Sequence, residues 1–396
     1  METFDIVIVG GGVAGATAAA RYRQVGGTGT VAIISADRNP PVNRPPLSKD
    51  YLRGDTALEA VFVHPLQFYE DKGINLRLAT PVDALDLATK QIELADGGRI
   101  GFGTLVLATG AHPRHLSIPG SDLQGIHYLR SLSSSEQLRT DSQSARHAVI
   151  IGAGFIGMEV ASSLTQRGVH CTVVEVGPRI WPTLVPDTVA AFVQSCYTNK
   201  GVDFRFGHKV VALEGDTRVQ SVVLDDGETL PADLVVAGIG AILNTKLAED
   251  AGLAVDHGVQ VDTYLRTTHA DVYAIGDIAN FPDPVIGHVH VEHFDSAIDQ
   301  GNAVGRTLAG HPTSFNEVAS FYSDIFDLTL HLIGYPLGWD DTAMQPPARS
   351  PLETPFTITY AKDHVLRAAL MVNDDAQQSW AEMIRDRAPA GALTSA

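Results

Sequence analysis

The sequence predicts an α/β protein made of two copies of one strand, turn, helix and strand unit, with a smaller α+β region at the C-terminus. Two observations support this fold class. A glycine-rich turn follows a continuous apolar strand twice, at residues 10–15 and at 152–157, and each turn leads into an alanine-containing helix. Residues 356–372 alternate as two strands joined by a short polar turn. With 396 residues, the chain is long enough for two or three domains.

The first turn has the glycines that a dinucleotide-binding site needs. The apolar strand 4–9 leads directly into it. Gly10 allows the tight turn, Gly12 lets the backbone approach a pyrophosphate, and Gly15 lets the helix pack closely on the strand. The amino terminus of the helix then faces the phosphates.

The second turn repeats this pattern with Gly152, Gly154 and Gly157. A single glycine-rich turn can serve a bend without a ligand, but both copies here have a strand, turn, helix and second strand in order. The sequence therefore predicts two Rossmann-like dinucleotide-binding domains arranged as in glutathione reductase.

Each unit has an acidic residue after its second strand, where a carboxylate can bind a ribose hydroxyl. In the first unit the candidate is Asp37, and Ser35 competes because the register is uncertain by one or two residues. In the second unit the candidate is Glu175, about 20 residues after the turn. Glu175 would repel a 2′-phosphate, which favours NADH over NADPH, although Arg179 is close enough in sequence to oppose it.

Three further segments indicate how the chain passes between the two units. Residues 104–111 form a buried strand ending in small residues, where the chain can cross to the second unit. Residues 232–240 repeat that pattern and indicate the crossing back. A third short strand ends in Gly276 and Asp277, which can cap a helix, bind a flavin, or do both.

Composition narrows the classes of partner. The sequence has 28 Lys and Arg against 46 Asp and Glu, a formal charge of −18, which disfavours nucleic acid and anionic membranes. We expect a cytoplasmic protein, because no apolar run could span a bilayer and the N-terminus has no secretory leader. Cys171 and Cys196 are 25 positions apart and form no redox pair, so electrons must leave by another route than a dithiol.

A group of histidines within residues 288–293 suggests a metal, but its geometry does not favour one. In a strand His288, His290 and Glu292 share one face, whereas His293 points the other way. We therefore expect no metal site.

The sequence resembles the FAD-dependent ferredoxin reductases that serve bacterial Rieske oxygenases and cytochromes P450, relatives of rubredoxin reductases and apoptosis-inducing factor. The resemblance covers roughly residues 4–335 and is most specific at 43–49, which contain the R-P-P-L-S-K segment of the family. Val42 stands where the family usually has an aromatic residue. Leu243 and Tyr322 also depart from the usual Pro and Trp, at positions expected to lie away from the chemistry.

The resemblance implies FAD on the first unit and NADH on the second. It divides the chain into an FAD-binding domain of residues 1–110 and 241–315, an NAD-binding domain of 111–240 and a C-terminal interface domain of 316–396. Together with the two turns, it places the following residues at the cofactors: Gly10, Gly12, Ala14, Gly15, Asp37, Arg44, Lys49, Val82, Ala108, Thr109, Gly110, Arg130, Gly152, Gly154, Ile156, Gly157, Glu175, Gly238, Gly240, Gly276, Asp277, Glu292 and Phe294.

The same resemblance implies that Lys49 and Glu159 lie near the flavin and the nicotinamide. A lysine there favours the anionic reduced flavin, and an opposed glutamate keeps that lysine charged and oriented. The alternative for Glu159 is an exposed carboxylate in the first turns of a helix, paired with an arginine.

The implied function is transfer of electrons from NADH through FAD, one at a time, to a [2Fe-2S] ferredoxin of an oxygenase system, as in aromatic hydrocarbon catabolism. Another acceptor such as rubredoxin, a quinone or an organic radical is an alternative, as is a redox-sensing protein like apoptosis-inducing factor. His64, Asn302 and His331 stand where relatives often carry docking Arg or Lys, and the acidic balance weakens the ferredoxin interpretation. The chain is expected to be a monomer or a homodimer.

Overall fold

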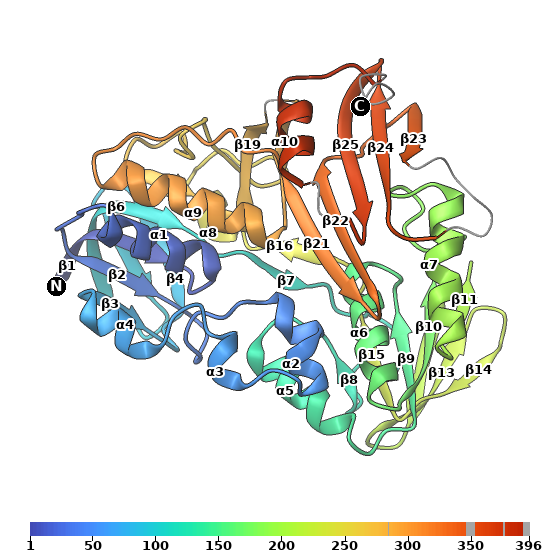
Figure 1. Ribbon diagram of the computed structural model, residues 1–396. Helices are drawn as coiled ribbons and strands as arrows, with labels where there is room; N and C mark the ends of the chain where they lie inside the picture. The colour runs from blue at the N-terminus through green and yellow to red at the C-terminus, as the bar shows by residue number, and fades with distance from the viewer. Residues whose placement is uncertain (284, 346–352, 375–376, 391–396) are drawn as a thin grey trace.

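Three large β-sheets organise the chain in the computed structural model (Figure 1). The first sheet lies at the left of Figure 1, the second at the lower right and the C-terminal sheet at the upper right. The structure describes residues 1–283, 285–345, 353–374 and 377–390. Within these residues, no helix combines the length and the apolar character needed to cross a bilayer.

The first sheet has the strand order β3-β2-β1-β6-β5-β4, with β18 beside β6. Strands β3, β2, β1, β6 and β18 are parallel, and β4 and β5 are antiparallel. The parallel strands have apolar runs because helices and loops cover both faces of the sheet. Their bounds are β1 Glu2–Val9, β2 Val31–Ile34, β3 Ile74–Arg77, β4 Val82–Asp86, β5 Gln91–Leu94, β6 Arg99–Leu107 and β18 Val272–Ala274.

Two helices distant in sequence pack closely beside this sheet. Helix α1 (Val13–Gln24) follows the first glycine-rich turn, and α9 (Phe294–Leu308) lies against it. Side chains at Gly301 and Gly305 would overlap backbone oxygens of α1, so these glycines permit the close approach. The late segment is thereby fixed to the beginning of the chain.

The second sheet is parallel throughout, with the order β11-β10-β9-β15-β8. Helix α6 (Phe155–Gln166) follows the second glycine-rich turn as α1 follows the first. The strands are β8 Ile126–His127, β9 His147–Ile151, β10 His170–Glu175, β11 Asp203–Phe206 and β15 Leu234–Ala237. Both predicted strand, turn, helix and strand units are therefore present.

The two passages between the units lie side by side. Strand β7 (Ala111–Pro113) leads out of the first sheet, and β16 (Ala241–Leu243) returns toward it. The two strands pair antiparallel. Asn244, directly after β16, donates to the Thr109 carbonyl at 2.8 Å, and the Thr109 hydroxyl donates to the Asn244 carbonyl at 2.7 Å.

The C-terminal sheet is antiparallel, with the order β21-β22-β25-β24-β23. Strands β24 and β25 are the two predicted from residues 356–372. Their apolar faces share a core with α6, the second sheet and helix α7 (Asp187–Asn199), as the ring of Phe356 beside Phe192 shows. The bounds are β21 Ser320–Ile325, β22 Leu328–Gly334, β23 Asp341–Gln345, β24 Phe356–Lys362, β25 Val365–Val372 and helix α10 Gln377–Arg385.

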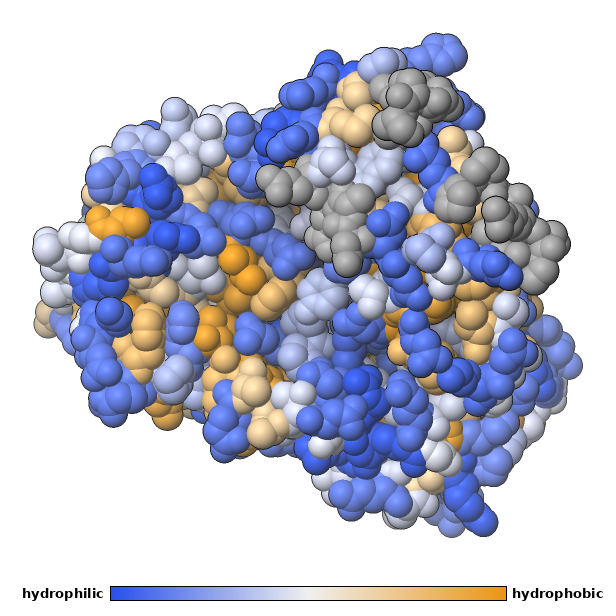
Figure 2. All heavy atoms as spheres, viewed as in Figure 1, coloured by the Kyte–Doolittle hydropathy of each residue, from blue (hydrophilic) through white to orange (hydrophobic). Residues whose placement is uncertain are grey.

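The remaining elements are short connections and two small sheets, β12-β13-β14 and β17-β19-β20. Figure 2 shows a largely hydrophilic face on which hydrophobic side chains gather around α3 and α4. The bounds are η1 Pro45–Ser48, α2 Asp50–Arg53, α3 Leu58–Val61, α4 Leu66–Asp71, α5 Leu132–Asp141, α7 Asp187–Asn199, β12 Val210–Gly215, β13 Val219–Leu224, β14 Thr229–Pro231, α8 Lys246–Asp250, β17 Val259–Gln260, η2 Gly276–Ile278, β19 Ala279–Asp283 and β20 Gly287–His290.

Candidate active site

The two glycine-rich turns have the same geometry. Gly10 has a φ of 124° and Gly152 a φ of 102°, both in the region that favours glycine. A side chain at Gly10 would overlap the carbonyl of Ala108, and one at Gly152 would overlap the carbonyl of Gly238. Each turn therefore packs against the end of a neighbouring strand, where the predicted site residues Ala108 and Gly238 lie. Gly12 and Gly154 are the N-cap residues of α1 and α6, so the first amides of both helices point away from the sheet.

The first turn faces two arginines and an aspartate. Arg130 forms an ion pair with Asp277 at 2.5 Å and donates from Nε to the Ala111 carbonyl at 2.9 Å. A methyl group built on Gly110 would lie 3.4 Å from Arg130, 3.8 Å from Asp277 and 4.0 Å from Arg44. The structure therefore brings these four predicted residues together beside the first turn.

Arg44 carries a positive charge that is poorly compensated within the protein. Burial of its guanidinium, followed by repulsion from Arg130, lowers the pKa of Arg44 to about 10. One of its terminal nitrogens lies 3.9 Å from a methyl group built on Gly12. Two guanidinium groups beside free helix amides form a site for a doubly charged anion, so the residues present fit the pyrophosphate of FAD.

Residues 276–294 provide another wall of this site. The Gly276 amide donates to the Gln300 side chain at 2.8 Å, and a methyl group on Gly276 would lie 3.2 Å from Ala14. Phe294 begins α9, and Glu292 precedes it with its carboxylate 3.7 Å from His290. Among the described residues, the histidines of this segment form no cluster with metal-ligand spacing. The one group that does is His208, Asp225 and Asp226, in the connections after β11 and β13.

The second turn holds the predicted ribose acid. The two oxygens of Glu175 accept hydrogen bonds from the amides of Ala153 and Gly177, each at 2.7 Å. Arg179 instead pairs with Asp187 at 2.8 Å and donates to nearby backbone carbonyls. The carboxylate therefore lies against the turn, whereas the competing arginine is held elsewhere.

In the first unit, Ser35 occupies the position that Glu175 occupies in the second. Each directly follows the residue whose carbonyl accepts a hydrogen bond from the first glycine of its turn. Asp37 lies two residues further on; its amide donates to the Ser35 hydroxyl at 3.2 Å and its carboxylate accepts from the Asn39 amide at 3.0 Å. The ribose role of Asp37 stays a prediction, and Ser35 is the residue at the equivalent position.

The predicted adenine contact lies beside these residues. The amides of Ala79 and Thr80 donate to the carbonyls of Asp37 and Ser35 at 2.8 and 2.7 Å. Val82, which begins β4, follows directly and is partly buried. The segment thus lies beside the end of β2, and the adenine contact of Val82 stays a prediction.

Lys49 and Glu159 form a buried ion pair between the two units. Lys49 follows η1, Glu159 lies on α6, and they are 6% and 4% exposed. Their Nζ and Oε1 atoms are 2.9 Å apart. Glu159 is therefore not an exposed helix carboxylate paired with an arginine. Two other predicted residues at the start of α6 do not contact this ion pair: Ile156 is 44% exposed, and Gly157 packs against Gly152.

The C-terminal sheet also reaches this pair, which the sequence did not predict. The Tyr322 ring lies 5.2 Å from Lys49 Nζ, and the Ser323 hydroxyl donates to Glu159 at 2.7 Å. Burial raises the pKa of Tyr322 to about 12. The expectation that the departure at Tyr322 lies away from the chemistry is wrong, because β21 passes directly over the lysine. Leu243, by contrast, lies in the crossing strand β16.

The three residues at the expected docking positions have different surroundings. His64 stacks on Phe68 with ring centres 3.9 Å apart, and burial lowers the pKa of His64. The Asn302 side chain accepts from Arg21 at 2.8 Å. The ring centre of His331, on β22, lies 6.2 Å from that of Tyr322.

The sequence and the fold are similar to those of known flavoprotein reductases. The family described as pyridine nucleotide-disulphide oxidoreductase matches residues 4–301. The chain is 35% identical to a ferredoxin–NAD(P)(+) reductase of Sphingomonas sp., covering 93% of this chain and 90% of that protein, and 37% identical to a rubredoxin–NAD(+) reductase of Pseudomonas putida, covering 83% and 86%. The crystal structure of a covalent putidaredoxin reductase–putidaredoxin complex matches with a TM-score of 0.93 and 31% identity, over 98% of this chain and 94% of that one.

Proposed function

Because the chain belongs to the pyridine nucleotide-disulphide oxidoreductase family, we propose that it is an NADH-dependent flavoprotein reductase that passes electrons singly to a [2Fe-2S] ferredoxin of a cytoplasmic oxygenase system. It is an oxidoreductase whose cofactors are FAD and NAD(H). The observation that carries the proposal is the buried Lys49–Glu159 pair, which joins the two nucleotide-binding units without any redox-active cysteine pair.

The first unit has the groups that would hold FAD. Arg44, Arg130 and the amides after Gly12 would bind the pyrophosphate, and Asp277 would orient Arg130 and accept from a ribityl hydroxyl. When bound, FAD accepts a hydride and releases electrons one at a time. With FAD on the first unit, we divide the chain after residues 110, 240 and 315 into the FAD-binding, NAD-binding and C-terminal interface domains.

The protein groups between the units would position the reaction and tune its charge. Lys49 would place a cation near the reducible ring, and Glu159 would keep that cation charged and directed. Tyr322 lies beside Lys49, and Phe155 and Phe321 have ring centres 4.1 Å apart; these aromatic side chains would limit the access of water to the same region.

The test of this function is electron transfer with and without a ferredoxin. We expect NADH to drive cytochrome c reduction strongly only when a ferredoxin from the source organism is added. Rubredoxin is the second candidate acceptor, because a relative of 37% identity carries that name. Reduction through rubredoxin alone would favour this second acceptor, and negligible turnover with any carrier would favour a redox-sensing role.

The position of Glu175 predicts the choice of nucleotide. Wild-type protein should have a higher kcat/KM for NADH than for NADPH, because the carboxylate repels a 2′-phosphate. Glu175→Ala should narrow that ratio about tenfold, equivalent to about 1.4 kcal/mol. Steady-state kinetics with both nucleotides measure this change. Arg179→Ala is the control and should leave the preference intact, because Arg179 is paired with Asp187. Equal efficiencies in the wild type would contradict the assignment.

The docking face predicts a pH dependence for an acidic ferredoxin. Protonation of His64 adds positive charge at this face, so KM for the ferredoxin should fall several-fold as pH falls from 8 to 6. Since burial lowers the pKa of His64, its share should appear in the lowest part of that range. Added salt should help or be neutral at pH 8, where screening removes repulsion between two acidic proteins.

The matched control separates the histidines from a nearby carboxyl group. Burial, followed by Glu317, raises the pKa of Asp299 to about 6, so falling pH also removes negative charge from α9. Burial also raises the pKa of Asp295 on the same helix. The double variant His64→Ala/His331→Ala should keep only the share of these two carboxyl groups, which Asp295→Asn/Asp299→Asn would then abolish. A double variant with the full wild-type pH profile would show that the docking face lies elsewhere.

A further inference from the structure

Ser323 reaches the centre of the site from the C-terminal sheet. It lies on β21, is fully buried at 0% exposure, and donates its hydroxyl hydrogen to Glu159 Oε1 at 2.7 Å. The two residues are 164 positions apart. The contact therefore connects the third large sheet of the fold with the helix that follows the second glycine-rich turn.

The Glu159 carboxylate has three hydrogen-bond donors, and they fix its orientation. Oε1 receives Lys49 Nζ at 2.9 Å and the Ser323 hydroxyl, while Oε2 receives the Ser48 hydroxyl at 2.5 Å. A buried carboxylate paired with one cation still has lone pairs to satisfy, and two hydroxyls on different oxygens satisfy them. Because the donors come from two separate segments, rotation of the carboxylate would break at least one of the three contacts.

We propose that Ser323 is a positioning residue for the reduction step, which holds Glu159 Oε1 against Lys49. The proposal rests on the proposed role of the Lys49–Glu159 pair. Without the Ser323 hydroxyl, Oε1 would keep a single donor and the carboxylate could turn toward Ser48. The cation of Lys49 would then be less firmly held where negative charge develops.

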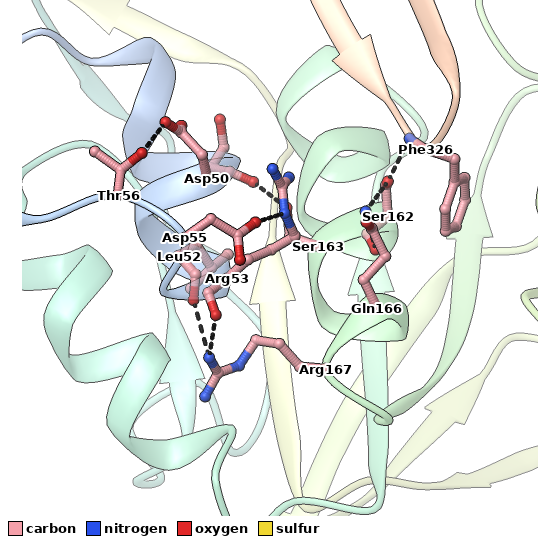
Figure 3. Close-up of polar contacts among 11 residues, drawn as sticks. Asp50, Leu52, Arg53, Asp55, Thr56, Ser162, Ser163, Gln166, Arg167 and Phe326 are labelled. Carbon is pink, nitrogen blue, oxygen red and sulfur yellow. Dashed lines mark hydrogen bonds and ion pairs between the residues drawn. The ribbon is translucent and has the colours of Figure 1, made fainter.

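Other contacts join the same parts of the chain and make Ser323 unnecessary as an anchor. The Ser162 hydroxyl accepts from the Phe326 amide at 2.9 Å, one turn further along α6 (Figure 3). Arg167 donates to the carbonyls of Leu52 and Arg53 at 3.3 and 2.9 Å, as the same close-up shows. Loss of the one hydroxyl should leave the packing of α6 against both neighbours in place.

The experiment compares Ser323→Ala with Ser162→Ala in the FAD-loaded protein. Ser162→Ala removes a hydroxyl at the same junction without touching Glu159. In anaerobic stopped-flow, Ser323→Ala should lower the limiting rate of flavin reduction by NADH about tenfold, with the Kd of NADH within about twofold of wild type. Ser162→Ala should leave the limiting rate unchanged.

A double-mutant cycle with Glu159→Ala tests whether Ser323 acts through Glu159. In that background Ser323→Ala should have no further effect on the rate. In FAD-free protein that retains Glu159, Ser323→Ala should lower the midpoint of urea unfolding. In FAD-free Glu159→Ala protein, the same substitution should leave the midpoint unchanged. An equal rate loss in both backgrounds, or an equal loss from Ser162→Ala, would overturn the proposal. If Glu159→Ala lowers the limiting rate of flavin reduction and Ser323→Ala does not, only the proposal for Ser323 is overturned. If both variants keep the wild-type limiting rate, the proposed role of the Lys49–Glu159 pair is overturned as well.

Discussion

Replacing Glu159 by alanine is expected to slow flavin reduction by NADH about 10- to 1,000-fold, the range for a positioned electrostatic group. The physical reason is that Lys49, 6% exposed, would lose its only ion-pair partner among the described residues. The Kd of NADH should change much less, since the ribose of the nucleotide is predicted to bind at Glu175, which lies against the second turn and makes no contact with Lys49. Anaerobic stopped-flow at saturating NADH measures the limiting rate directly.

Glu159→Gln is the matched control for this result. The amide keeps an oxygen that can accept from Ser323 or Ser48 but removes the negative charge. If charge is the main contribution, Glu159→Gln should be nearly as slow as Glu159→Ala. An unchanged limiting rate in Glu159→Ala, with FAD still bound, would show that the pair only stabilises the junction between the units.

Arg44→Met is expected to weaken FAD binding about 10- to 100-fold, because a charge-assisted hydrogen bond to a phosphate is lost. The same change should leave the stability of the FAD-free protein unchanged or raise it. Burial and Arg130 lower the pKa of Arg44 to about 10 although Asp277 and Asp37 oppose this shift, so at pH 7 the charge of Arg44 destabilises the FAD-free protein and an anionic ligand would offset that cost. Fluorescence titration of apoprotein with FAD gives the affinity, and urea unfolding of the apoprotein gives the stability.

Arg44→Lys separates charge from geometry in this experiment. Lysine keeps the positive charge but lacks the planar fork that binds a phosphate through two nitrogens, so its FAD affinity should fall between wild type and Arg44→Met. Arg179→Ala provides an unrelated control, because the Arg179 guanidinium pairs with Asp187 beside the second unit. Equal FAD affinity in all variants would mean that Arg44 does not face the cofactor.

The two nucleotide-binding units were predictable from sequence because their signals are local. Each glycine-rich turn and its flanking apolar strands lie within about 30 residues, and steric limits at Gly10 and Gly152 specify the turn. The strands β24 and β25 were predictable for the same reason, since alternation over residues 356–372 has a period of two.

Two features were not predictable in this way: which residue after β2 stands at the ribose position, and the contact of the C-terminal sheet with Glu159. A difference of two residues in where β2 ends decides between Ser35 and Asp37, and the apolar pattern does not define that end. Ser323 contacts Glu159 across 164 positions through the packing of whole sheets. No periodicity of either segment carries that information, although the family segment containing Tyr322 could have indicated a role.

The pairing of β7 with β16 makes residues 111–243 a closed excursion from the first unit. The chain leaves and returns through neighbouring strands, with Ala111 opposite Leu243, so the intervening segment has its two ends together. A segment whose two ends lie together can be replaced by the matching segment of a relative without changing the path of the rest of the chain. Nucleotide preference, which is predicted to depend on Glu175 within residues 111–243, could then change in evolution without a change in the flavin site, provided that the incoming helix still carries a carboxylate for Lys49 and Ser323.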